Sequence, residues 1–196
     1  KSVAYRTISL VGFSMGGNLS LVYLGRDAQN VPEQVQAAVC ISVRCDLAAA
    51  SASLAEPRNA IYMRRFLRLM GRKVRLQARN YPDQFPCDDY HKLKTFNDFD
   101  GRYTAPLHGF HDAQDYWRQC SSNRYLSAIR RPVWIVNARN DSFLPPACYP
   151  DFSQHGNSCV TLIVPEHGGH CGFSSPGKAQ SYWSEELAVR LLSRFP

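Results

Sequence analysis

The chain has 196 residues, of which 44% are hydrophobic and 20% charged, and its formal net charge is +7. This length suffices for one domain with a substantial core, and the composition excludes a disordered or fibrous chain. No run approaches the roughly 18 consecutive apolar residues of a membrane-spanning helix, so we expect no transmembrane segment. The seven cysteines are odd in number and form no C-x-x-C pair, which predicts free thiols in a reducing, cytoplasmic compartment.

The first predicted unit is a strand, a sharp turn and a helix. An apolar run over Thr7–Val11 leads into Gly12-Phe13-Ser14-Met15-Gly16, and a helix-like run over Gly17–Leu24 follows. Gly-x-Ser-x-Gly between a strand and a helix is the nucleophile-elbow pattern, in which the serine has a positive φ. Strand and helix are then expected to approach so closely that only glycine fits two residues before and two after Ser14. The alternative is a glycine-rich loop that opens an ordinary helix.

The remaining elements predict an α/β fold interrupted by an insertion. Val35–Val43, Pro132–Ala138 and Cys159–Val164 are typical of buried strands, and strands joined by helices imply parallel pairing. Between them, from about residue 46 to 131, the pattern changes to helices and loops, and we expect a cap over the site there. Helices are predicted at Leu47–Leu54, Arg58–Arg79, Asp112–Cys120 and Ser122–Ile129, and at the C-terminus, where Trp183, Leu187, Leu191 and Phe195 recur at four-residue steps.

A nucleophilic serine needs a base and an acid that orients the base. In a fold of this kind they follow in the chain order serine, acid, histidine, each after a strand. Asp141 follows the third predicted strand and His170 the fourth, so they are the favoured acid and base. Asp46, after the second strand, is the alternative acid, and His167 is the alternative base.

Two other chemistries involve the glycine-rich loop at Glu166–Phe173. His167, His170 and Cys171 are zinc-ligand types, but no further ligand cluster accompanies them, so we expect no metal. Cys171 next to a histidine also suggests a thiol nucleophile, for which Ser14 is the stronger candidate. His108 and His111 are expected to be structural.

Arginines carry much of the positive charge. If Ile61–Arg79 is helical, Arg64, Arg68, Arg72 and Arg75 form one stripe, and Met63, Phe66, Leu67, Met70 and Val74 form another. The ordinary interpretation is a solvated face over an apolar core. The alternative is peripheral contact with anionic lipid through the arginine stripe. No recognition motif accompanies the charge, so we expect no nucleic-acid partner.

Several motifs occur together along the chain: Gly12-Phe13-Ser14-Met15-Gly16-Gly17-Asn18, Phe99-Asp100, Tyr103–Phe110, Asp115-Tyr116-Trp117, Asn137-Ala138 and Glu166–Phe173. Together they resemble the YheT-like branch of the α/β-hydrolase superfamily over essentially the whole chain. The resemblance implies a mostly parallel sheet with helices on both faces, a helical cap and carboxylic-ester hydrolysis. It assigns Ser14 as nucleophile, Asp141 as acid and His170 as base. Where the family often has Asp-Asp-Pro-Phe, this chain has Asn140-Asp141-Ser142-Phe143, so the acid is kept.

The resemblance also implies that residues 1–196 are a partial domain, truncated at the N-terminus. Earlier strands, and the loop that gives a second oxyanion donor, are expected before the elbow, so Met15 N–H is the one donor assigned here. We therefore expect a serine esterase without cofactor or metal, acting on a small-molecule or lipid-like ester. Acyl transfer by the same triad, or a non-catalytic binding protein of the same fold, are the alternatives.

Overall fold

The computed structural model describes residues 5–151, 156–174 and 182–195. They divide into two compact units, one made of the described residues up to Asp46 and from Ser121 onward, and the other of Leu47–Cys120. No helix in these described ranges is both long and apolar enough to cross a membrane.

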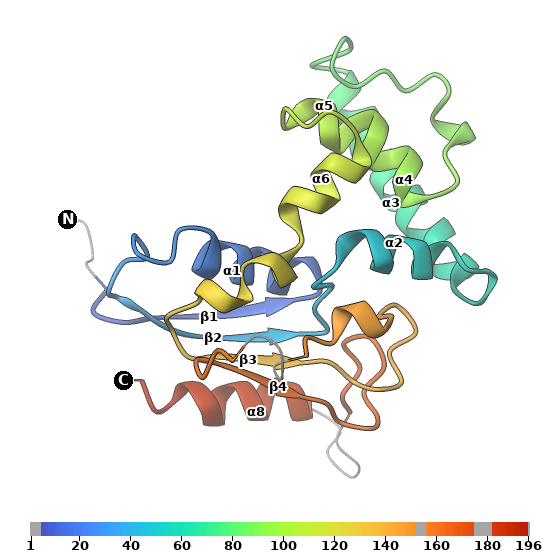
Figure 1. The fold of residues 1–196 in the computed structure, drawn as a ribbon. Coiled ribbons are helices and arrows are strands. Elements are labelled where there is room, and N and C mark those ends of the chain that lie inside the picture. The colour runs from blue at the N-terminus through green and yellow to red at the C-terminus, as the bar shows by residue number, and fades with distance from the viewer. Residues whose placement is uncertain (1–4, 152–155, 175–181, 196) are drawn as a thin grey trace. The chain divides into compact units, whose positions relative to one another are not determined.

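The first unit is built on a parallel sheet with the strand order β1-β2-β3-β4 (Figure 1). Phe13 pairs with Ile41, Ile41 with Val136, and Val136 with Ile163, so the carboxyl ends of the strands lie level at one edge. Ligands and catalytic groups of open α/β sheets lie at this edge. The strands are β1 (Ile8–Phe13), β2 (Val35–Ile41), β3 (Val133–Val136) and β4 (Val160–Ile163).

Helices cover both faces of this sheet. Successive side chains of a strand point to opposite faces, so each central strand contributes to two cores. Ala38 and Cys40 of β2 pack in one buried cluster with Leu21 and Leu24 of α1 (Met15–Arg26). Val39 and Ile41 pack in another with Leu187 and Leu191 of α8 (Trp183–Leu192), on the opposite face in Figure 1. The predicted α/β fold with a parallel sheet between helices is confirmed.

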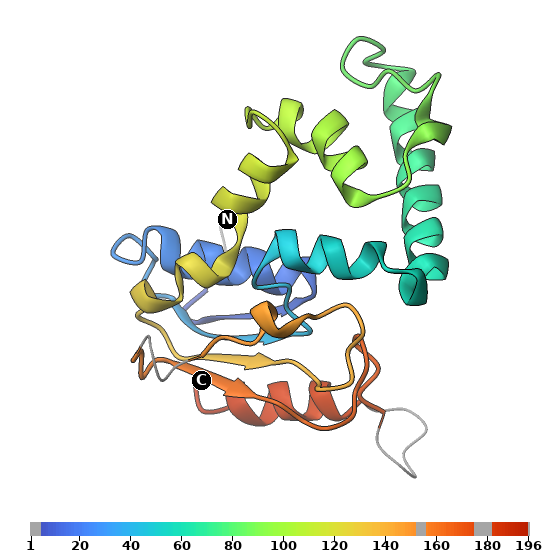
Figure 2. The same cartoon turned by 45° about the vertical axis from the view of Figure 1, so that its right-hand side comes forward.

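The second unit is helical and has an aromatic core of its own. Val74, Tyr90 and Tyr103 are buried together, and the Tyr90 hydroxyl donates a 2.6 Å hydrogen bond to the Leu67 carbonyl. Figure 2 shows α3 as the long helix that follows α2 after a bend. The helices are α2 (Leu47–Ala55), α3 (Ala60–Ala78), α4 (Phe96–Phe99), α5 (Ala105–Leu107) and α6 (Ala113–Cys120), with a π-helical segment at Asp100–Thr104.

The end of the predicted insertion needs correction. We expected it to run from about 46 to 131, but the second unit ends at Cys120. The next residues pack with α1: the Ser122 N–H donates to Asn18 Oδ1 at 3.0 Å, and Leu126 and Ile129 join the α1 core. The predicted helix over 122–129 is instead two 3₁₀ turns, at Ser122–Arg124 and Leu126–Ala128.

Candidate active site

Ser14 lies at the turn between β1 and α1, and its backbone is strained. Its φ is 52° and its ψ is −113°, a conformation rarely adopted by a residue with a Cβ. Ser14 occupies the N-cap position of α1, where serine usually accepts a bond from a backbone N–H of the first turn. No such capping bond is made. The Oγ is therefore available to other partners, and the residue is half-buried.

The close contacts around Ser14 require glycine at position 12, as the pattern predicts, and at position 17 in place of position 16. A Cβ on Gly12 would come within 2.6 Å of the backbone of Gly16 and Gly17, so glycine is needed two residues before the serine. A Cβ on Gly16 would meet no described atom within 4 Å. The close approach after the serine is at Gly17, where a Cβ would lie 2.7 Å from Val43 Cγ2. The expectation that only glycine fits at position 16 is therefore wrong for the described residues.

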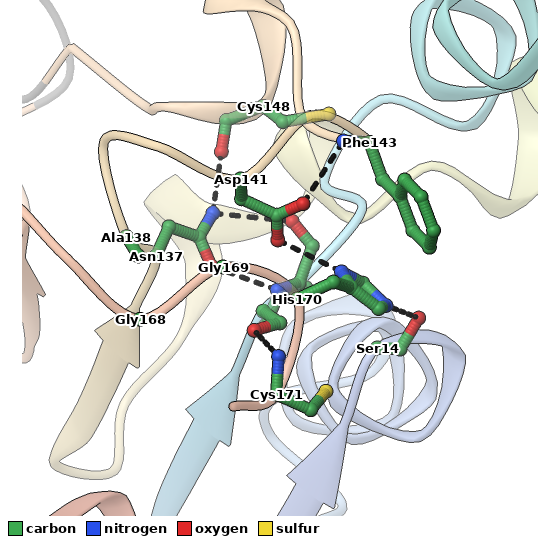
Figure 3. Close-up of polar contacts among 12 residues, drawn as sticks. Ser14, Asn137, Ala138, Asp141, Phe143, Cys148, Gly168, Gly169, His170 and Cys171 are labelled. Atoms are coloured by element: carbon green, nitrogen blue, oxygen red, sulfur yellow. Dashed lines mark hydrogen bonds and ion pairs between the residues drawn. The ribbon is translucent and has the colours of Figure 1, made fainter. Parts of the chain in front are cut away.

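Ser14, His170 and Asp141 form one chain of hydrogen bonds (Figure 3). Ser14 Oγ lies 3.0 Å from His170 Nε2, and His170 Nδ1 lies 2.8 Å from Asp141 Oδ2. The Asp141 side chain is fully buried and that of His170 is 18% exposed. The other oxygen, Asp141 Oδ1, accepts the Phe143 N–H at 2.9 Å. The sequence-predicted nucleophile, base and acid are thus brought together, from loops 156 and 29 residues apart in the chain.

The loop that carries His170 is tightly wound. Gly169 and Cys171, on either side of His170, both have positive φ values, of 53° and 64°. The N–H groups of Gly172 and Phe173 both donate to the Gly168 carbonyl, at 2.9 and 3.0 Å. A Cβ on Gly168 would lie 2.4 Å from the Phe173 ring. This winding directs the His170 ring toward Ser14 (Figure 3).

Two side chains hold the histidine loop from its two sides. Asn140, next to the acid, accepts the N–H groups of Gly168 and Gly169 on its Oδ1, at 3.0 and 2.8 Å. Ser42, after β2, accepts the Cys171 N–H on its Oγ at 3.1 Å and itself has a φ of 52°. The sequence reasoning assigned neither residue a role. Asn140 could have been suspected, because it adjoins Asp141 and asparagine commonly accepts backbone N–H groups.

The acid loop is fixed by a buried amide and a phenol. Asn137 Oδ1 accepts the Val43 N–H at 2.7 Å, while Asn137 Nδ2 donates to the Cys148 carbonyl at 2.9 Å. The Tyr149 hydroxyl donates to the Ala138 carbonyl at 2.6 Å. Burial, and then the negative charge of Asp141, raise the pKa of Tyr149 to about 12. This phenol therefore stays protonated and keeps donating at physiological pH.

The Phe143 ring packs on the imidazole, with 4.5 Å between its centroid and that of His170. Phe143 is buried, and its backbone N–H binds the acid. One residue thus restrains both the base and the acid. In the sequence Phe143 is only part of a motif, because its contact with His170 depends on the folding of two separate loops.

The alternative acid and base lie elsewhere. Asp46 is half-buried, and its carboxylate is 3.5 Å from Asn123 Nδ2, while Asp141 holds His170. His167 is exposed, as are His108 and His111.

The thiol and metal alternatives gain no support from the geometry. Burial raises the pKa of the Cys171 thiol above its usual value, which disfavours the reactive thiolate. None of the seven cysteines, all of which lie in the described ranges, forms a disulfide. Within the described ranges, no group of three metal-ligating side chains lies close enough to hold an ion.

The arrangement fits nucleophilic attack by a serine. His170 Nε2 is placed to take the Ser14 proton, and Asp141 to hold the imidazole by its other nitrogen. Met15 is the first residue of α1, so its N–H belongs to the amides that the helix leaves without an internal acceptor. Such an N–H, at the positive end of the helix dipole, suits a developing oxyanion.

Known proteins resemble this chain in sequence. The family model for the alpha/beta hydrolase fold matches residues 5–175. Phospholipase ABHD3 of Mus musculus is 34% identical over 83% of this chain and 39% of its own length. The putative esterase YheT of Escherichia coli is 32% identical over 83% of this chain and 48% of its own length. The chain therefore spans less than half the length of these two relatives.

Solved structures share the fold at low sequence identity. The Pyrococcus furiosus esterase Pf2001 superposes with a TM-score of 0.51 at 17% identity, over 96% of this chain and 54% of that one. Pyrococcus horikoshii acylaminoacyl peptidase superposes with a TM-score of 0.53 at 13% sequence identity, over 98% of this chain and 24% of that one. Strand order, nucleophile elbow and family model agree with the predicted family, and the chain belongs to the α/β-hydrolase family, in its YheT-like branch.

Proposed function

We propose that this chain carries the catalytic triad of a serine hydrolase that cleaves carboxylic esters. The observation that carries the proposal is the unbroken chain of hydrogen bonds from Asp141 through His170 to Ser14, at 2.8 and 3.0 Å. The strained serine backbone supports it further, because strain of this kind persists at functional sites.

In the proposed reaction, Ser14 Oγ attacks the carbonyl carbon of the ester while His170 Nε2 takes the serine proton. Asp141 keeps the imidazole in the right tautomer and stabilises the imidazolium that forms. The oxyanion of the tetrahedral intermediate accepts the Met15 N–H. The intermediate then expels the alcohol, which receives the proton from His170, and leaves an acyl group on Ser14. Water, activated by His170, attacks this acyl-enzyme and releases the acid and the free serine.

We propose a lipid-like or other apolar ester as substrate. Two relatives, named a phospholipase and a putative esterase, support this class. The second unit, Leu47–Cys120, is inserted between β2 and β3, and we propose that it acts as a cap-like insertion of the hydrolase domain.

The proposal is tested by hydrolysis of p-nitrophenyl esters by the natural protein that carries this chain. Ser14→Ala should lower kcat by about 10⁴-fold or more, because it removes the nucleophile. Ser193→Ala, which removes an exposed hydroxyl near the C-terminal end of α8, is the matched control and should leave kcat unchanged. Near-normal ester hydrolysis by Ser14→Ala would refute the serine mechanism.

A further inference from the structure

The charged side chains of helix α3 are all positive. Its 19 residues include no aspartate or glutamate, and its six basic side chains are all exposed. They are Arg64, Arg65, Arg68, Arg72, Lys73 and Arg75. Among the described residues, ion pairs join other arginines and lysines to carboxylates, but none of these six. A helix that only solvates a protein surface usually mixes both signs of charge, so this face suits an anionic partner.

The apolar side chains of α3 lie on two different sides. Met63, Leu67 and Val74 are buried and pack inward within the second unit. Tyr62, Leu69 and Leu76 are instead exposed, by 49%, 38% and 58%. They recur every seven residues, which is nearly two helical turns, so they form one line along the helix.

Each of these exposed apolar residues is followed three positions later by an arginine. Arg65, Arg72 and Arg79 therefore lie beside Tyr62, Leu69 and Leu76, since residues three apart are neighbours on a helix, and Arg79, the C-cap of α3, still has helical backbone angles. We call these six residues the outer face of α3. The stripe expected from the sequence, Arg64, Arg68, Arg72 and Arg75, shares one arginine with this face and otherwise borders it.

We propose that the outer face of α3 docks on an anionic lipid surface. The guanidinium groups would bind lipid phosphates, for which their planar fork of donors is well matched. Tyr62, Leu69 and Leu76 would enter the headgroup region, where aromatic and aliphatic side chains leave water. A nucleic-acid backbone would satisfy the arginines but would not remove the three apolar side chains from water. The alternation of apolar and basic residues therefore favours the lipid.

The test is co-sedimentation of the natural protein with phosphatidylcholine vesicles, with and without phosphatidylserine, at low ionic strength. We expect binding only when phosphatidylserine is present, and its loss on adding salt. A cation near an anionic membrane strengthens binding by about fivefold, so Arg65→Glu/Arg72→Glu/Arg79→Glu should lower the vesicle partition coefficient by more than about 100-fold. Leu69→Ser/Leu76→Ser should also weaken binding, at unchanged charge.

The matched control is Arg26→Glu/Arg190→Glu/Arg194→Glu, which changes the net charge equally at exposed positions of the first unit. It should leave most of the vesicle binding in place. Equal loss in this control, no binding by the unmutated protein, or outer-face binding to RNA or DNA in place of vesicles would each overturn the proposal. Ser14→Ala should bind vesicles normally, so failure of the proposed catalysis and failure of the docking surface are separate results. Thermal melts of each variant verify that it is folded.

Discussion

The Ser14 hydroxyl does not accept the hydrogen bond from the first turn of α1 that an N-cap serine usually accepts. The missing capping bond costs about 1 kcal/mol of stability, and the strained backbone costs about 1–3 kcal/mol. Both terms destabilise this turn. The surrounding structure supports it: the Ser14 N–H donates to the Ile41 carbonyl at 2.8 Å, and Gly12 leaves room for the helix. What the arrangement gains is an Oγ within hydrogen-bond distance of His170.

The proposed role of Asp141 as the acid can be tested by replacing its carboxylate with an amide. Asp141→Asn should leave folding intact and lower kcat by roughly 10⁴-fold, because an amide favours the wrong tautomer of His170. Asp46→Asn is the matched control, since Asp46 also follows a strand but does not hold the histidine. Ester hydrolysis by the two purified variants decides between them. If Asp46→Asn proved the more damaging, the assignment of Asp141 as acid would fail.

The order of serine, acid and histidine along the chain was enough to select Ser14, Asp141 and His170 as candidates, because each follows a predicted strand. It could not identify Phe143, Ser42 or Asn140 as their supports. The contact of Phe143 with His170, and the bond from Cys171 to Ser42, depend on how separate loops fold. The same limit explains the misplaced glycine requirement: the spacing indicates close contacts around the serine, but it does not reveal that Gly17, beside Val43, is the tight position after Ser14 in place of Gly16.

The loop that carries His170 is held by the neighbouring loop that carries Asn140. Asn140 Oδ1 holds two successive N–H groups of the histidine loop, directly before His170. Removing a shared acceptor leaves both donors unmatched and frees the loop to move. Misplacement of a catalytic group by about 1 Å can cost about 10²-fold in rate, so a small shift at Asn140 matters.

Asn140→Ala should therefore lower kcat by about 10²-fold with little change in KM. Asn140→Asp should restore much of the activity, because a carboxylate oxygen can accept the same two N–H groups. His167→Ala changes an exposed residue of the same loop and serves as control. Steady-state kinetics and thermal melts separate the outcomes: a variant with a lowered Tm but normal kcat would show that Asn140 is only structural.

The pattern of apolar runs predicted the sheet well and the insertion less well. Buried parallel strands are continuous apolar runs, which is why β2, β3 and β4 were located to within a few residues. β2 ends at Ile41, short of the predicted Val43, because Ser42 turns to a positive φ. The boundary at Cys120 was missed because the segment after it, predicted as one helix over 122–129, forms two 3₁₀ turns that are fixed by contacts with α1.

In the whole molecule, Ser14, Asp141 and His170 all belong to the first unit, and the insertion forms a compact unit of its own. The basic outer face of α3 belongs to that second unit, and its proposed lipid contact is independent of the triad chemistry. The chain covers 39–48% of the two relatives compared above. Activity is therefore best measured on the natural protein that carries this chain.

Covalent labelling can locate the nucleophile directly. A fluorophosphonate probe is added to the natural protein, which is then digested, and the modified peptide is sequenced by mass spectrometry. We expect a single adduct on Ser14 Oγ, no adduct in Ser14→Ala, and much slower labelling in His170→Ala. An adduct on another residue, or undiminished labelling in Ser14→Ala, would contradict the assignment of Ser14 as nucleophile.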